Sequence, residues 1–318
     1  MTMGAPSHRT VHTNGIRMHV VEHGEGPVVV FCHGFPELWH SWRHQIGPLA
    51  DAGFHVVVPD QRGYGATDRP EAVEAYDIVQ LTGDMVGLLD ALGVDDAVFV
   101  GHDWGAPVVW NLSVLAPERV RAVAGLSVPF NPRGERDPIT TMEFLFADRF
   151  FYILYFQTPG IADAELAADV EGTFRRLMRP SSRELGEAAI HAAPQGAGFL
   201  DTLGPPGALP SWLTDADLDA YVATFTETGF TGGLNWYRNL RRNWELTAHV
   251  EDWTVRAPAL FLTGSEDPVR RFMSDAHLDD FVPDLRARIT LDGAGHWVQQ
   301  ERADEVTAAL LAFLGTLD

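Results

Sequence analysis

The sequence contains no lysine, and all 23 of its basic residues are arginine. Without a lysine amine the chain cannot form a Schiff base, anchor a pyridoxal cofactor or build a Walker-type phosphate loop. The formal net charge of −21 argues against nucleic acid or an anionic membrane surface as a partner. These absences leave chemistry that carboxylates, histidines and neutral groups carry out.

Cysteine and long apolar runs are equally scarce. The one cysteine, Cys32, rules out a disulfide within the chain, and its apolar neighbours favour a buried core residue over a reactive thiol. No stretch approaches the ~18 apolar residues of a membrane span, and residues 1–10 lack the apolar segment of a signal peptide. We therefore expect a cytoplasmic protein with no membrane partner. The sequence leaves the oligomeric state open, and the aromatic residues of 130–250 are compatible with a homodimer.

Segments typical of strands alternate with segments typical of helices over most of the chain. This rhythm predicts an α/β fold with a mostly parallel central sheet and helices on both faces. It stops near Pro129 and resumes near residue 258, so we expect two parts of one core, 1–129 and 251–318, separated by a helical insertion, 130–250, here called the lid. The expected strands are 16–22, 28–32, 54–59, 96–100, 120–128, 258–264 and 286–291. The expected helices are 40–53, 77–93, one after residue 103, 141–156, 163–178, 214–229, one near 268–282, and 301–315.

Polar residues follow several of the expected strands, in an order that points to catalysis. Ligands of open parallel sheets bind beyond the carboxyl ends of the strands. There the sequence places Asp103 within Gly-His-Asp-Trp-Gly (101–105), then Asp267, then His296 within Gly-His-Trp (295–297). Nucleophile, acid and histidine follow this chain order in α/β-hydrolases, with serine in the nucleophile elbow where Asp103 stands here. The alternatives are a helix N-cap for Asp103 and a helix start for Asp267, which Glu266 precedes.

An aspartate in the elbow predicts a different reaction from a serine. A carboxylate can displace a leaving group from saturated carbon and form an alkyl ester on the enzyme. We expect His296, oriented by Asp267, to activate the water that hydrolyses this ester. The backbone N–H groups of Phe35 and Trp104 would form the oxyanion hole for that second step. The reaction expected is therefore cleavage of a carbon–oxygen or carbon–halogen bond, and an ordinary esterase is disfavoured.

Several motifs together resemble the epoxide hydrolases of the α/β-hydrolase superfamily. They are His-Gly-Phe-Pro at 33–36, the elbow at 101–105, Gly-His-Trp at 295–297, the loop 59–70, and the lid segments 152–160 and 235–239. The resemblance implies hydrolysis of a small-molecule epoxide by water to a vicinal diol, without cofactor or metal. It also implies that Tyr152 and Tyr237 donate hydrogen bonds to the epoxide oxygen, with Tyr155 as the alternative to Tyr152. Phe35, Pro36 and Trp104 would contact the substrate.

Two other functions stay open at this stage. A haloalkane dehalogenase would share the Asp-Trp elbow and the ester intermediate, although a leaving halide needs no proton from a tyrosine. A non-catalytic ligand-binding homologue would need only the pocket. Residues 19–23 also spell the His-x-x-Glu-His zinc pattern, but that pattern needs a helix. The valine-rich surroundings predict a strand, so we expect no metal there.

Overall fold

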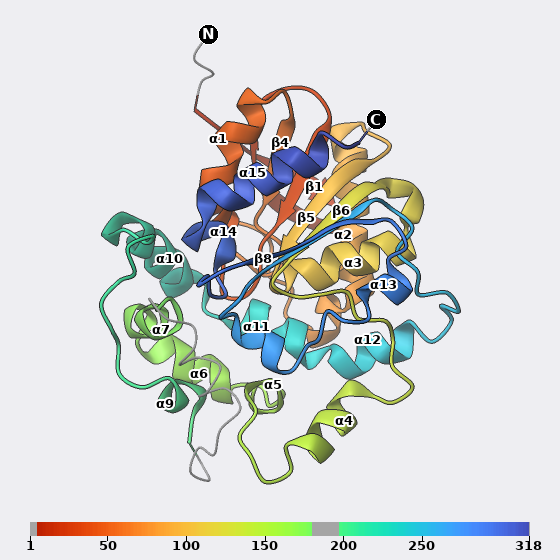
Figure 1. Cartoon of the computed structure of the whole chain (residues 1–318). Helices are drawn as coiled ribbons and strands as arrows, with labels where there is room; N and C mark the ends of the chain where they lie inside the picture. Colours follow the sequence, from red (N-terminus) through yellow and green to blue (C-terminus); the bar gives the residue numbers. More distant parts are fainter. Residues whose placement is uncertain (1–4, 180–196, 318) are drawn as a thin grey trace.

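A mostly parallel eight-stranded sheet forms the centre of the computed structural model, which describes residues 5–179 and 197–317 (Figure 1). The strands run β1-β2-β4-β3-β5-β6-β7-β8 across the sheet, and only β2 is antiparallel to its neighbours. The predicted α/β architecture is confirmed. The strands are β1 (Ser7–Thr13), β2 (Ile16–His23), β3 (Val28–Cys32), β4 (His55–Pro59), β5 (Ala97–His102), β6 (Val120–Leu126), β7 (Ala259–Gly264) and β8 (Leu285–Leu291).

Helices cover both faces of the sheet because its central strands are apolar on both sides. Along β3, Val28, Val30 and Cys32 point into one buried cluster, and Val29 and Phe31 into the other. Helices α2 (Ile78–Leu92) and α3 (Gly105–Leu115) pack on the first face, and α1 (Arg43–Asp51) and α15 (Ala303–Leu314) on the second (Figure 1). Such double cover is what continuous apolar strands require.

Local capping explains where the predicted helix at 77–93 begins and ends. The Asp77 side chain accepts a hydrogen bond from the Gln80 N–H, and Gly93 ends α2 in the left-handed conformation that glycine adopts without strain. Strand β1, in contrast, was not predicted. Most of its residues are exposed at the edge of the sheet, so it lacks a buried apolar pattern.

Three of the predicted helices are wrong in extent. The segment 141–156 contains α4 (Pro138–Leu145) and the short α5 (Tyr152–Tyr155), because the rings of Phe146 and Phe151 stack 4.0 Å apart and turn the chain between them. The segment 163–178 is divided into α6 (Ile161–Ala168) and α7 (Val170–Leu177) by Asp169, which caps α7. Between 268 and 282 there are only η4 (Pro268–Arg271) and α13 (Leu278–Phe281). The terminal segment holds α14 (Val298–Glu301) before α15.

The lid is helical throughout its described part and gathers at one end of the sheet (Figure 1). No strand occurs within 130–179 or 197–250; residues 180–196 of the predicted insertion lie outside the described residues. The lid boundaries at 130 and 250 stay a prediction. Besides α4 to α7, the lid helices are α9 (Phe199–Thr202), α10 (Asp215–Thr228), α11 (Thr231–Arg238) and α12 (Leu240–Leu246).

Specific polar contacts hold the lid against the core. The Trp236 indole donates to the carbonyl of Arg62 (3.1 Å), in the loop that follows β4. On the other side, Arg43 of α1 pairs with Asp217 of α10 at 2.9 Å. These contacts fix α10 and α11 over the carboxyl ends of the strands. Across residues 5–179 and 197–317, none of the helices has the length and apolarity needed to span a bilayer.

Candidate active site

Asp103 occupies a strained turn between β5 and α3. Its φ angle is +47°, an unusual conformation for a residue with a side chain. The turn is so tight that a Cβ at Gly105 would lie 2.1 Å from the Cys32 carbonyl oxygen, so only glycine fits there. No side chain caps α3, and the Asp103 carboxylate accepts instead from the backbone N–H of Phe35 at 2.7 Å. The helix-cap alternative therefore fails, and the carboxylate is presented to the space beyond the sheet.

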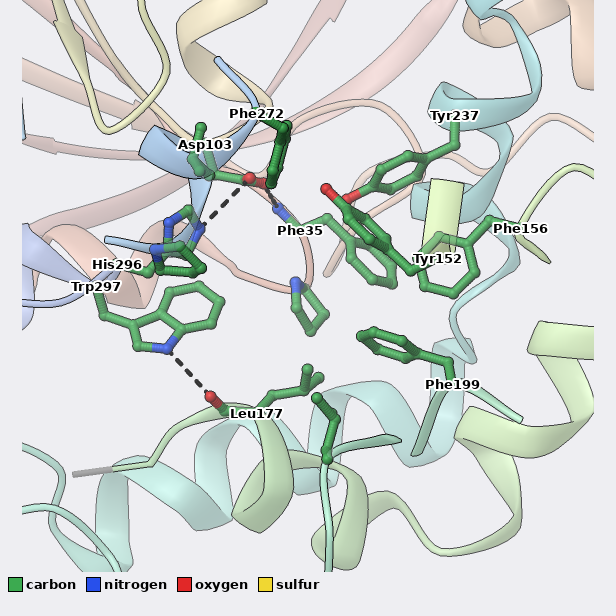
Figure 2. Close-up of a pocket in the computed structure, with 14 residues that line it drawn as sticks. Phe35, Asp103, Tyr152, Phe156, Leu177, Phe199, Tyr237, Phe272, His296 and Trp297 are labelled. Atoms are coloured by element: carbon green, nitrogen blue, oxygen red, sulfur yellow. Dashed lines mark hydrogen bonds and ion pairs between the residues drawn. The ribbon is translucent and has the colours of Figure 1, made fainter. Parts of the chain in front are cut away.

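His296 lies between two carboxylates. Its Nδ1 donates to Oδ1 of Asp267 at 3.1 Å. Its Nε2 lies 3.5 Å from Oδ2 of Asp103, the contact drawn in Figure 2. Asp267 is held in place because the Val269 N–H donates to the same Oδ1 at 2.9 Å. Burial alone would lower the pKa of His296, but the charges of Asp267 and Asp103 outweigh it and hold the pKa well above its ordinary value.

The side chain of Glu301 fixes the loop that carries His296. Its two carboxylate oxygens accept from the backbone N–H groups of Gly295 at 2.7 Å and Trp297 at 2.9 Å, one on each side of the histidine. The Trp297 indole also donates to the carbonyl of Leu177 in the lid at 3.3 Å (Figure 2). The position of His296 is thereby set by its neighbours on both sides in the chain.

Two lid tyrosines face Asp103. Tyr152 of α5 and Tyr237 of α11 have ring centroids 6.0 Å apart, and Figure 2 shows their hydroxyl groups side by side and turned toward Asp103. Burial and the nearby charge of Asp103 raise the pKa of both phenols, so both are neutral donors. Tyr155 does not line the cavity. Burial and its hydrogen bond with Glu165 raise its pKa to about 12.

These groups share one narrow cavity of about 90 Å³ (Figure 2). Its polar groups are Asp103, His296, Tyr152 and Tyr237, and the remaining wall is apolar. That wall consists of Phe35, Pro36, Phe156, Leu177, Phe199, Leu203, Pro268, Val269, Phe272 and Trp297. Such a site fits a small apolar ligand whose one polar atom meets the two phenols.

The position of Trp104 differs from the one that the resemblance implies, which is in contact with the substrate. It does not line the cavity, because its indole lies behind the wall, edge-on to Tyr237 at 5.1 Å and to Trp236 at 5.9 Å. Its side chain is also a hydrogen-bond partner of Tyr237, which opposes the rise in the pKa of that phenol. Trp104 therefore supports a tyrosine in this structure, whereas Phe35 and Pro36 line the cavity, and their contact with substrate stays a prediction.

Comparisons with known proteins identify the family to which the chain belongs. A family profile described as alpha/beta hydrolase fold matches residues 27–303. Epoxide hydrolase A of Mycobacterium tuberculosis is 54% identical over 321 residues, which cover 99% of each chain. The solved structure of Epoxide Hydrolase A from Mycobacterium thermoresistibile is 55% identical with a TM-score of 0.94, again over 99% of each chain. The chain belongs to the epoxide hydrolase family. An epoxide hydrolase from an endophytic Streptomyces matches with 42% identity and a TM-score of 0.94, over 98% of this chain and 96% of that one.

This member of the epoxide hydrolase family also contains a buried network that was missed from the sequence. The Glu37 carboxylate accepts from the Gly34 N–H at 2.9 Å, from His102 Nδ1 at 2.7 Å and from the Gln299 amide at 2.7 Å. His102 Nε2 donates to the carbonyl of His296 at 2.8 Å. Burial would raise the pKa of Glu37, but His102 and the other donors lower it to about 2. The network joins the loop of Phe35 to the loop of His296.

The zinc-like pattern at 19–23 lies on β2 and not on a helix, as expected. His19 bonds to Asp60 at 2.8 Å, and Glu22 pairs with Arg9 at 2.8 Å on the edge of the sheet. Within the described ranges no cluster of histidine, cysteine or acidic side chains is arranged to hold a metal ion. His19 and Glu22 are thus engaged with Asp60 and Arg9, and none of these residues lines the cavity of this epoxide hydrolase family member.

Proposed function

We propose that the enzyme hydrolyses a small, apolar epoxide to a vicinal diol through a covalent ester on Asp103. One observation carries the proposal: a single apolar cavity holds a carboxylate, a histidine within 3.5 Å of it and two neutral phenols. The relatives named above are epoxide hydrolases that match almost the whole chain, which supports the same activity here.

In the first step, Oδ2 of Asp103 attacks a ring carbon and the carbon–oxygen bond of the epoxide breaks. Oδ1 stays bound to the Phe35 N–H and becomes the carbonyl oxygen of the ester. The leaving alkoxide is a strong base, so it needs a donor at the moment of cleavage. Tyr152 and Tyr237 bind this oxygen, and one of them transfers its proton to it. The phenolate that forms recovers a proton from His296, which becomes neutral once Asp103 has lost its charge.

In the second step, water attacks the carbonyl carbon of the Asp103 ester. Nε2 of His296 takes a proton from this water, and Asp267 stabilises the imidazolium that forms. The negative charge that develops on Oδ1 is met by the Phe35 N–H. Collapse of the intermediate breaks the bond to the diol oxygen, which takes the second proton of the water, and restores the Asp103 carboxylate beside a protonated His296. The sum is epoxide plus water giving diol.

The dehalogenase alternative is supported less well by the same cavity. A halide leaves without a proton, so a dehalogenase would gain nothing from two protonated phenols facing the nucleophile. A non-catalytic binding role would leave the strained conformation of Asp103 without a purpose, since strain of this kind persists mainly at functional sites. The proposed homodimer and the cytoplasmic location stay predictions from the sequence.

The test compares wild-type enzyme with Asp103→Ala on styrene oxide and on a bromoalkane. We expect diol from styrene oxide that depends on Asp103, and little halide release. A single turnover in ¹⁸O-water should label the Asp103 carboxylate and leave the first diol unlabelled, because water attacks the enzyme carbonyl. Halide release without diol would favour the dehalogenase, absence of both activities would favour the binding protein, and label in the first diol would refute the ester.

A further inference from the structure

We propose that Gln157 and Arg238 are positioning residues that set the separation of the Tyr152 and Tyr237 phenols, and that they control ring opening without acting on ester hydrolysis. Neither side chain lines the cavity. The inference rests on the proposed function, since it assigns the two phenols to the first step.

Gln157 joins the two tyrosine helices through a single amide group. Its Nε2 donates to the carbonyl of Ile153 at 2.9 Å, next to Tyr152 on α5, and to the carbonyl of Tyr237 at 3.0 Å, on α11. Both hydrogens of the amide are therefore used, one on each helix. The two carbonyl groups lie far apart in the sequence, and this amide fixes the distance between them.

Arg238 makes the reciprocal link in the opposite direction. It directly follows Tyr237, and its Nε donates at 3.1 Å to the carbonyl of Phe156, just after α5. The guanidinium is held by Asn235 at 2.8 Å and by Asp163, and only 3% of the Arg238 side chain is exposed. Asp163 is itself fixed, because it accepts from the Gly160 N–H at 2.8 Å. Each tyrosine helix is thus tied to the other by a residue close to its own tyrosine.

These links matter because α5 cannot hold Tyr152 by itself. It has only four residues, and isolated helices shorter than about 12–15 residues are marginal in water. The ring of Phe156 fills the corner between the two phenols, with centroid distances of 5.5 Å to Tyr152 and 5.1 Å to Tyr237. Apolar contacts of this kind are not directional, so they do little to prevent the rings from sliding past one another. The directional bonds of Gln157 and Arg238 supply the missing constraint.

A role in lid stability alone makes a different prediction from a role in positioning. Ring opening needs both phenols at one oxygen atom. Ester hydrolysis uses Asp103, His296 and the Phe35 N–H, which belong to the core and make no hydrogen bond with Gln157 or Arg238. Loss of positioning therefore slows only the first step, whereas a loosened lid slows both steps or lowers the melting temperature without changing either rate constant.

The experiment measures both rate constants by stopped-flow tryptophan fluorescence with styrene oxide, for wild type, Gln157→Met and Arg238→Lys. Methionine keeps the length of glutamine without its donors, and lysine keeps the charge facing Asp163 without the Nε bond to Phe156. Arg175→Gln is the matched control, because Arg175 pairs with Glu171 inside α7. A misplacement of about 1 Å costs on the order of 100-fold, so we expect ring opening to fall about 10- to 100-fold in both variants. Ester hydrolysis and the control should stay close to wild type.

Ring opening at the wild-type rate in folded Gln157→Met and Arg238→Lys would overturn the proposal. An equal fall in both rate constants would overturn it too, since that result indicates general loosening. If Gln157→Met does not fold, Arg238→Lys provides the same comparison. Absence of any ester in the wild-type enzyme would instead refute the proposed function, which distinguishes the two failures.

Discussion

Replacing the lid tyrosines by phenylalanine tests how ring opening is driven. Tyr152→Phe and Tyr237→Phe each remove one hydroxyl group and leave the ring, so the apolar wall of the cavity is preserved. Both hydroxyls face Asp103 in a buried site (Figure 2), where the proposed mechanism forms the alkoxide. A hydrogen bond to a charged group contributes roughly 1.5–3 kcal/mol. Each single change should therefore slow ester formation about 10- to 150-fold.

The double variant should be slower by about 10²- to 10⁴-fold, because roughly 3–6 kcal/mol of stabilisation is then lost. The measurement is the rate of ester formation under single-turnover conditions, followed by stopped-flow fluorescence and by rapid quench with mass spectrometry. Tyr155→Phe is the matched control on the same helix, since its hydroxyl bonds to Glu165 outside the cavity. Its rate should equal that of wild type.

Two results would refute this reasoning. One is a double variant that forms the ester nearly as fast as wild type, because the alkoxide would then be stabilised by other groups. The other is an equal loss in Tyr155→Phe and Tyr152→Phe, because the effect would then come from the helix and not from a hydroxyl in the cavity.

Three further outcomes follow from the structure. His296→Gln should stall after the first step, with hydrolysis slowed by about 10²- to 10⁴-fold, so that intact-protein mass spectrometry detects an adduct of the mass of the epoxide; no adduct would contradict the assigned roles. The pKa of Glu37, about 2, lies below its ordinary value of 4.5, so its charged form stabilises the fold above about pH 5, and that stability is lost as the pH falls toward 2. Urea unfolding at several pH values should therefore show a shallower dependence for Glu37→Gln than for wild type. Burial raises the pKa of the Cys32 thiol, so a disulfide reagent should label it only after unfolding, and fast labelling of native enzyme would show that this part of the core opens.

The sheet and the order of the site residues could be predicted because they depend on features that lie close together in the sequence. Strands β3, β4 and β7 are short, nearly continuous apolar runs. Each is followed directly in the sequence by the loop at its carboxyl end. The prediction of one continuous helix over 141–156 was wrong for a physical reason. The apolar residues of this segment have helical spacing, but the stacking of Phe146 on Phe151 stabilises a turn that no periodicity encodes.

The supporting residues of the site were not predictable in the same way. Gln157 and Glu301 bond to backbone carbonyl or N–H groups, which every residue possesses, so no partner type marks them in the sequence. Arg238 bonds to the carbonyl of Phe156 and to the side chains of Asp163 and Asn235, and Phe156 and Asp163 lie 82 and 75 positions away in the chain. Glu37 and Gln299 are 262 positions apart, and only the completed sheet brings them together. The one available signal was a carboxylate directly after His-Gly-Phe-Pro, and it points to Glu37.

The protonation of His296 leads to a last prediction, about the proton that the alkoxide needs. Burial alone would lower the pKa of His296, but Asp267 and Asp103 raise it well above its ordinary value, which favours a protonated imidazole in the resting enzyme. It becomes a base only when ester formation removes the charge of Asp103, which is also when the alkoxide takes up a proton. We expect the two changes to cancel, so that wild-type enzyme draws no proton from solvent while the ester forms, whereas His296→Gln draws one per ester. Stopped-flow measurements with a pH indicator in weak buffer compare the two, and equal uptake by both enzymes would show that His296 is neutral from the start.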